Sequence, residues 1–94
     1  MGSNFDYREY KTQTKDEVRK QFNAEAEEDR YMNGNSYSGG IGMLYGIDTW
    51  LEETFNTASE ATTFICNKHT KYDDGAMAAQ LTDGSWVIGG WCSS

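Results

Sequence analysis

Apolar residues recur every four positions between residues 15 and 32, and this spacing predicts an amphipathic helix over that range. Val18, Phe22 and Ala26 form the apolar stripe, while charged and amide side chains fill most of the remaining positions. A helix with one narrow apolar stripe packs one face against a core and leaves the rest in water. We therefore expect this helix to lie on the surface of the fold.

Two capping-box sequences mark helix starts along the chain. In the first, the hydroxyl of Thr14 can accept from the backbone N–H of Glu17, whose carboxylate can return to the N–H of Thr14. In the second, Thr57 and Glu60 have the same spacing. Apolar residues at helical intervals follow the second box, which predicts a short helix over residues 58–68.

Three further segments have the composition of strands. Residues 4–10 place Phe5 and Tyr7 on one side of an extended segment. Residues 41–47 belong to a glycine-rich stretch, and residues 49–55 place Thr49, Leu51, Glu53 and Phe55 on one face. The glycine-rich tract suits a turn, or a strand that another backbone approaches closely.

The C-terminal segment predicts a β-hairpin. Asp83-Gly84 lies between two apolar runs and suits a two-residue type I′ turn. That turn places Leu81 opposite Trp86 and Ala79 opposite Ile88 on one face, with Met77 opposite Gly90.

The predicted order is strand, helix, two strands, helix and hairpin. Short connections of this kind indicate an α+β fold, with a small antiparallel sheet of four to five strands and two helices packed on one face. The chain has 94 residues, which is the length of one domain, so we expect a single domain over residues 1–94.

Charge and composition narrow the function. There are 15 acidic and 8 basic residues, giving a net charge of −7, and binding to nucleic acid phosphates needs the opposite sign. No signal peptide and no apolar run of about 20 residues is present, so we expect no membrane contact. Two cysteines are too few for a disulfide framework and favour reduced thiols in a cytosol, with one intramolecular bridge as the open alternative.

Candidate catalytic and metal-binding patterns are incomplete. Cys66 and His69 share a helix face, but zinc needs three or four ligands. No Lys follows the glycine tract as a phosphate-binding loop requires. We therefore expect no enzyme activity, no metal and no cofactor.

The surplus of acidic and aromatic residues supplies candidate contacts with a partner. Acidic residues gather in the first predicted helix and again in the strand 49–55, although a purely solubilising surface is an alternative explanation of the same charges. Six tyrosines exceed what so small a core encloses, and exposed tyrosines are favoured as binding anchors. The predicted partner-binding residues are Glu25, Glu28, Asp29, Glu52, Glu53, Tyr31, Tyr37 and Trp91.

Two tracts carry a resemblance to known proteins. Tyr37-Ser38-Gly39-Gly40-Ile41-Gly42 and the terminal Trp86-Val87-Ile88-Gly89-Gly90-Trp91-Cys92-Ser93-Ser94 resemble small, mostly uncharacterised proteins of bacteriophages and prophages. The size, the acidity and the lack of a catalytic motif also resemble phage anti-defence inhibitors, including anti-CRISPR proteins. This resemblance implies binding to a host nuclease or surveillance complex, and it transfers no residue roles.

The leading expectation is a non-enzymatic inhibitor in the cytoplasm of a bacterial host. It would bind a host protein with a basic, nucleic-acid-binding surface, and no nucleic acid directly. Two alternatives stay open: a small-ligand protein that binds a nucleotide signal, and a phage structural or assembly protein. A homodimer through a sheet edge stays open as well.

Overall fold

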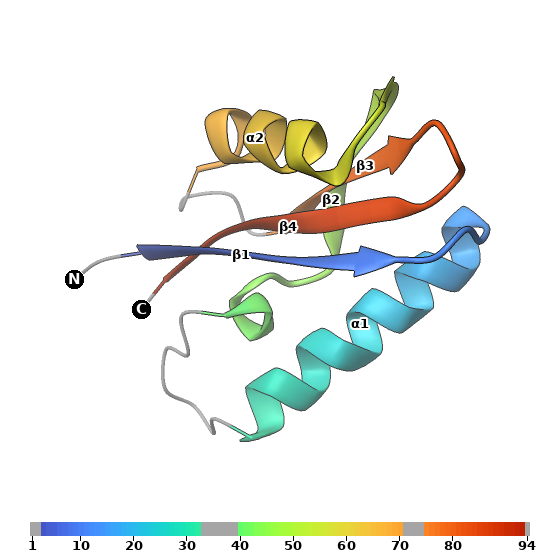
Figure 1. Cartoon of the computed structure of the whole chain (residues 1–94). Helices are drawn as coiled ribbons and strands as arrows, with labels where there is room; N and C mark the ends of the chain where they lie inside the picture. The colour runs from blue at the N-terminus through green and yellow to red at the C-terminus, as the bar shows by residue number, and fades with distance from the viewer. Residues whose placement is uncertain (1–2, 33–39, 71–74, 94) are drawn as a thin grey trace.

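The computed structural model describes residues 3–32, 40–70 and 75–93 of the chain. These residues form four strands, two α-helices and one 3₁₀ helix (Figure 1). The α+β class predicted from the sequence is confirmed, and the sheet has four strands where four to five were expected. In chain order the elements are β1 (Ser3–Tyr10), α1 (Lys15–Met32), η1 (Ile41–Met43), β2 (Ile47–Phe55), α2 (Ala58–Lys68), β3 (Ala76–Leu81) and β4 (Trp86–Ser93).

The strands lie in the order β1-β4-β3-β2, and the sheet is mixed. β4 is antiparallel to both β1 and β3, whereas β2 and β3 run parallel. The expectation of an antiparallel sheet is therefore corrected at one pair. The reason is that α2 connects β2 to β3 as a crossover, and parallel neighbours need such a connection.

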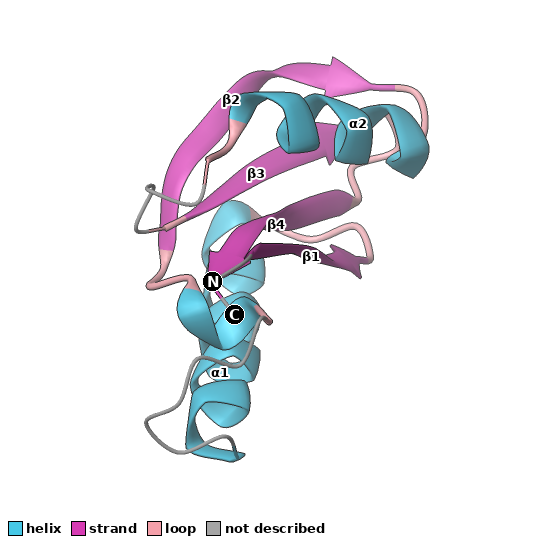
Figure 2. Ribbon diagram, turned by 90° about the vertical axis from the view of Figure 1, so that its left-hand side faces the viewer, coloured by secondary structure: helices cyan, strands magenta, loops and turns pink. Residues whose placement is uncertain are grey.

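The two helices cover opposite faces of the sheet, which corrects the expected packing on one face (Figures 1 and 2). Successive side chains of a strand point to opposite faces, and β4 contributes to both cores in this way. Trp86 and Ile88 pack in the cluster that contains Val18 and Phe22 of α1. Val87, which lies between them in the sequence, packs with Ile65 of α2.

Both helices begin at the predicted residues. The backbone N–H of Glu17 donates to Thr14 Oγ1 over 3.2 Å, and Glu17 Oε1 accepts from the N–H of Thr14 over 3.1 Å. At α2, the hydroxyl oxygen of Thr57 accepts from the N–H of Glu60 over 3.1 Å. These local contacts satisfy N–H groups that the helices leave without intrahelical partners.

The hairpin between β3 and β4 forms, but its register is one residue away from the predicted one. Ala79 pairs with Val87, and Met77 pairs with Gly89. The turn has three residues instead of two: the N–H of Leu81 donates to the carbonyl of Ser85, and Gly84 has a φ of +90°. A three-residue hairpin places its left-handed glycine after a type I turn.

The strand predicted over residues 41–47 is wrong. Residues 41–43 form η1 instead, and the N–H of Leu44, directly after it, donates to the carbonyl of Ile41 over 2.9 Å. β2 begins only at Ile47 and includes the whole of the predicted strand 49–55. In the described ranges, no helix is both long enough and apolar enough to span a bilayer.

Candidate functional site

A shallow groove of about 290 Å³ lies between α1, β1 and η1. The wall formed by α1 carries four side chains at positions i, i+3, i+4 and i+7, so they share one face of the helix. The structure therefore brings together three of the predicted partner-binding residues. The residues that line the groove are Arg8, Glu25, Glu28, Asp29, Met32 and Ile41.

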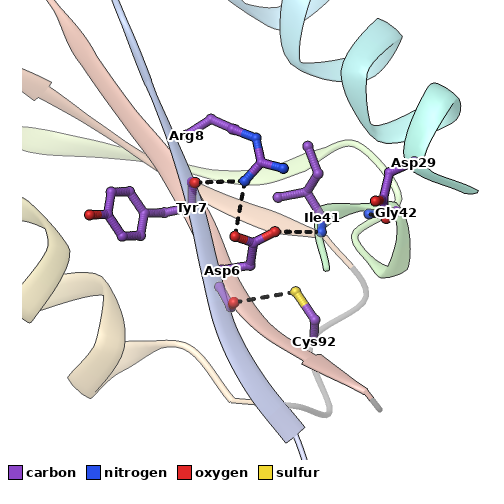
Figure 3. A network of polar contacts seen from close by, with 8 residues as sticks. Asp6, Tyr7, Arg8, Asp29, Ile41, Gly42 and Cys92 are labelled. Atoms are coloured by element: carbon purple, nitrogen blue, oxygen red, sulfur yellow. Dashed lines mark hydrogen bonds and ion pairs between the residues drawn. The ribbon is translucent and has the colours of Figure 1, made fainter. Parts of the chain in front are cut away.

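Asp29 has a structural task in this groove. Its Oδ2 accepts from the backbone N–H of Gly42 over 2.9 Å. On the other side of η1, Asp6 Oδ2 accepts from the N–H of Ile41 over 2.9 Å (Figure 3). Two carboxylates thus bind the N-terminal N–H groups of η1, where negative charge is favourable. Part of the predicted acidic surface is therefore used inside the fold.

Arg8 and Arg30 complete this polar network. Arg8 lies beside Asp6 on β1, and its guanidinium donates to Asp6 Oδ1 over 2.9 Å (Figure 3). Arg30 donates from Nε to the Gly42 carbonyl over 2.8 Å. The guanidinium of Arg30 also lies 4.6 Å from the ring centroid of Tyr45, which is cation–π geometry. Arg30 therefore contacts η1 directly, whereas Arg8 binds the Asp6 carboxylate that contacts η1.

Below the groove, the hydroxyl of Tyr10 and one carboxylate oxygen of Glu25 are buried. Tyr10 is only 6% exposed. Burial is the largest cause that raises the pKa of Tyr10, and the adjacent Glu25 carboxylate raises it further. Tyr10 therefore stays protonated at physiological pH, with its hydroxyl turned toward a carboxylate that lines the groove.

The C-terminal end of α1 carries large side chains that the fold does not cover. After Ala26 the helix has no further buried residue. Tyr31 is 85% exposed and Met32 is 76% exposed. Neighbouring large apolar side chains that are exposed mark protein interaction surfaces, so this end of α1 is a candidate interface.

The remaining predicted residues lie elsewhere. Glu52 and Glu53 are exposed on β2, at the opposite edge of the sheet from β1. Trp91 is half-buried, and its indole N–H donates to the Cys66 carbonyl at the end of α2. Tyr37 lies outside the described residues. The described members of the predicted set thus lie on three elements, α1, β2 and β4.

His69 is buried among backbone groups and does not form a metal site with Cys66. Its Nδ1 accepts from the N–H of Trp91 over 2.9 Å, and its Nε2 lies 2.7 Å from the Gly75 carbonyl oxygen. Both ring nitrogens are therefore occupied. No group of three side chains suited to a metal ion occurs in the ranges that the structure describes.

The described part of the glycine tract does not offer its N–H groups to a phosphate. The N–H groups of Ile41 and Gly42 already donate to carboxylates, as described above. A phosphate would have to displace Asp6 and Asp29 and would meet their negative charge. This arrangement disfavours a nucleotide site at η1.

Sequence reasoning missed Asp6, Arg8 and Arg30. Asp6 lies 35 residues from Ile41 in the chain, and Arg30 lies 12 residues from Gly42. No short motif connects such positions. The sequence did contain one indication: a glycine-rich tract has backbone N–H groups that need acceptors, and charged side chains elsewhere in the chain can supply them.

A comparison with known proteins found no matching family model, no similar curated protein and no similar solved structure.

Proposed function

We propose that this protein is a non-enzymatic inhibitor of the phage type, which binds a host defence protein such as a CRISPR–Cas nuclease in the bacterial cytoplasm. The contact is the acidic groove together with the exposed end of α1. The partner's surface there is basic and normally binds nucleic acid. The carboxylates of Glu25 and Glu28 take the place of phosphates, and Tyr31 and Met32 supply apolar contact.

The observation that carries this proposal is the exposure of Tyr31 and Met32 on an acidic helix end. Large apolar side chains contribute most of the energy at protein interfaces, and surrounding charges set the rate and the specificity of association. Here both occur within the last two turns of one helix. Charge alone would also fit a solubilising surface, whereas the exposed apolar pair favours a docked partner.

The occupied imidazole of His69 supports a binding role over catalysis. It is the one histidine of the chain, and a general base needs a ring nitrogen that can reach a substrate proton. Both nitrogens of His69 contact backbone groups, and the side chain is 4% exposed.

A matched pair of charge reversals tests the proposal. The variant Glu25→Lys/Glu28→Lys changes the groove, and Glu52→Lys/Glu53→Lys makes the same change of charge on β2. Asp29 is left intact because it holds η1. Each protein is immobilised to capture partners from bacterial lysate, and each captured protein is identified by mass spectrometry and purified.

The purified partner is then titrated with each variant, and its binding to nucleic acid is measured alongside. We expect the groove variant to bind at least tenfold more weakly and to lose its inhibition of nucleic-acid binding, while the β2 variant behaves as wild type. Circular dichroism checks that both variants are folded. Equal affinities for all three proteins, or undisturbed binding of nucleic acid by the partner, would reject the proposal.

A further inference from the structure

Strand β1 forms one edge of the sheet, and its outer side has no neighbouring strand in the described structure (Figure 2). The carbonyl of Asp6 lies against Gly89 of β4, so the backbone of Asp6 points into the sheet. Backbone polar groups alternate in direction along a strand, so those of Phe5, Tyr7 and Glu9 point outward. They form a row of donors and acceptors that another strand can pair with.

In the single chain, the side chain of Arg8 contacts the centre of this row of backbone groups. The guanidinium of Arg8 donates to the Tyr7 carbonyl over 2.9 Å and to Asp6 Oδ1 over the same distance (Figure 3). Arg8 is therefore placed at the open edge, with an acidic neighbour on the same face of the strand.

The other edge of the sheet is poorly suited to pairing. β2 pairs with β3 through two register shifts, and it carries Asp48, Glu52 and Glu53. Like charges and irregular backbone geometry discourage a second strand there. β1 pairs with β4 without interruption and carries charges of both signs, Asp6 and Arg8.

Charge selects one register for an antiparallel pair of β1 strands. Outward-facing residues must oppose each other, so Tyr7 can oppose Phe5, Tyr7 or Glu9 of a second copy. The first option brings the two Asp6 side chains together, and the last brings the two Arg8 side chains together. Tyr7 opposite Tyr7 instead places each Arg8 opposite Asp6, the arrangement that is favourable.

We propose that β1 pairs with β1 of a second copy of the chain, antiparallel and with Tyr7 on the twofold axis. The two four-stranded sheets then join into one continuous sheet. Arg8 releases the Tyr7 carbonyl to the partner strand and binds the partner's Asp6. Oδ2 of Asp6 keeps the N–H of Ile41, because Arg8 uses the other oxygen. The pairing edge adjoins two other surfaces: Tyr7 and Glu9 lie beside the start of α2, and Arg8 lines the acidic groove.

Disulfide trapping tests the register directly. Tyr7→Cys and Glu9→Cys are each made in a Cys66→Ser background, and Cys92 is buried and does not compete. Opposed residues at the twofold axis have Cα atoms about 5.5 Å apart, which a disulfide can span, whereas the two Glu9 positions lie about 14 Å apart. With oxidised glutathione we expect a covalent dimer from Tyr7→Cys and none from Glu9→Cys. Absence of the Tyr7→Cys dimer, or equal trapping of both variants, overturns the proposal.

Light scattering gives an independent measurement without engineered thiols. The wild-type chain should show a concentration-dependent dimer across the micromolar to millimolar range. Arg8→Glu places an acid opposite the partner's Asp6 and should weaken the dimer about tenfold or more. Arg19→Glu makes the same charge change on the exposed surface of α1 and should leave the dimer intact. A wild-type monomer at every concentration, or an equal effect of both reversals, overturns the proposal.

Discussion

The backbone N–H of Trp91 donates to Nδ1 of His69 over 2.9 Å, and this contact fixes the tautomer of the imidazole. Because Nδ1 is the acceptor, Nε2 carries the proton and donates to the Gly75 carbonyl over 2.7 Å. One buried side chain at the end of α2 thereby joins β4 to the residue that precedes β3. Gly90 lies against the same ring.

Removal of this side chain should destabilise the fold. In His69→Ala the Trp91 N–H and the Gly75 carbonyl lose their partner, and each unsatisfied group costs about 1–3 kcal/mol. Gly90→Ala should also destabilise, because an added Cβ would lie 2.5–2.7 Å from three ring atoms of His69. In the His69→Ala background that ring is absent, so Gly90→Ala should cost much less. A double-mutant cycle from urea unfolding measures this coupling, and strictly additive costs would contradict it.

Two glycines with positive φ should respond differently to alanine. Gly46 has a φ of +83° with open space around the added Cβ, so Gly46→Ala should cost about 1 kcal/mol of backbone strain. At Gly84, with a φ of +90°, the added Cβ would also lie 2.8 Å from Cγ2 of Thr12. Gly84→Ala should therefore cost more.

Thr12→Ser supplies the control for the second glycine. It removes Cγ2 but keeps the hydroxyl that donates to the Asp83 carbonyl. The cost of Gly84→Ala, measured by thermal and chemical unfolding, should fall in this background toward that of Gly46→Ala. An unchanged cost would show that backbone strain alone determines it.

Acidification should weaken two local contacts. The pKa of Glu17 lies below its ordinary 4.5, mainly because the backbone of Thr14 donates a hydrogen bond to it and secondly because the Thr14 side chain does. The pKa of Asp83 lies below its ordinary 3.8, mainly because of the hydrogen bond from the Ser85 side chain and secondly because of that from the Ser85 backbone. A carboxyl group whose pKa is lower in the folded than in the unfolded chain stabilises the fold at any pH above its unfolded-state pKa. This stabilisation is lost as the pH falls through its folded-state pKa. NMR titration of the carboxyl carbons should find both pKa values low. Ser85→Ala should raise only the pKa of Asp83, and only part of the way, because the backbone N–H of residue 85 still donates to this carboxylate. An unchanged pKa for Asp83 in the Ser85→Ala variant would refute the side-chain hydrogen bond as the main cause.

The two thiols should differ in reactivity. Burial, followed by the nearby Asp6 charge, raises the pKa of Cys92 to about 12, so its reactive thiolate is scarce at pH 8. Cys66 is only half-buried. A thiol reagent at pH 8 should label one cysteine of the folded chain and both in urea, with peptide mapping to assign the first to Cys66. Equal labelling rates in the folded protein would be inconsistent with a buried Cys92.

The helices could be predicted from the sequence because their limits are local. Thr14 and Glu17 lie within one turn, as do Thr57 and Glu60, so the sequence itself contains the contacts that start each helix. The hairpin was also visible, through Asp83 and Gly84.

The register and the packing of the sheet could not be predicted in the same way. A one-residue shift normally moves apolar side chains into water, and this penalty identifies the register. Here Trp86 and Val87 are both buried, on opposite faces, so a shift exchanges one core for the other. Helical spacing did place Glu25, Glu28 and Asp29 on one face, but the binding of η1 by Asp6 and Asp29 depends on contacts between distant parts of the chain.

The central position of β4 has a consequence for synthesis. Among the described strands, β4 comes last in the chain order, yet it is the only strand partner of β1 and contributes side chains to both cores. While it is still being made, α1 and α2 have no completed surface to pack on, and β1 has both edges open. The four-stranded sheet can therefore be completed only after β4 has been made, because β4 alone joins β1 to the other strands.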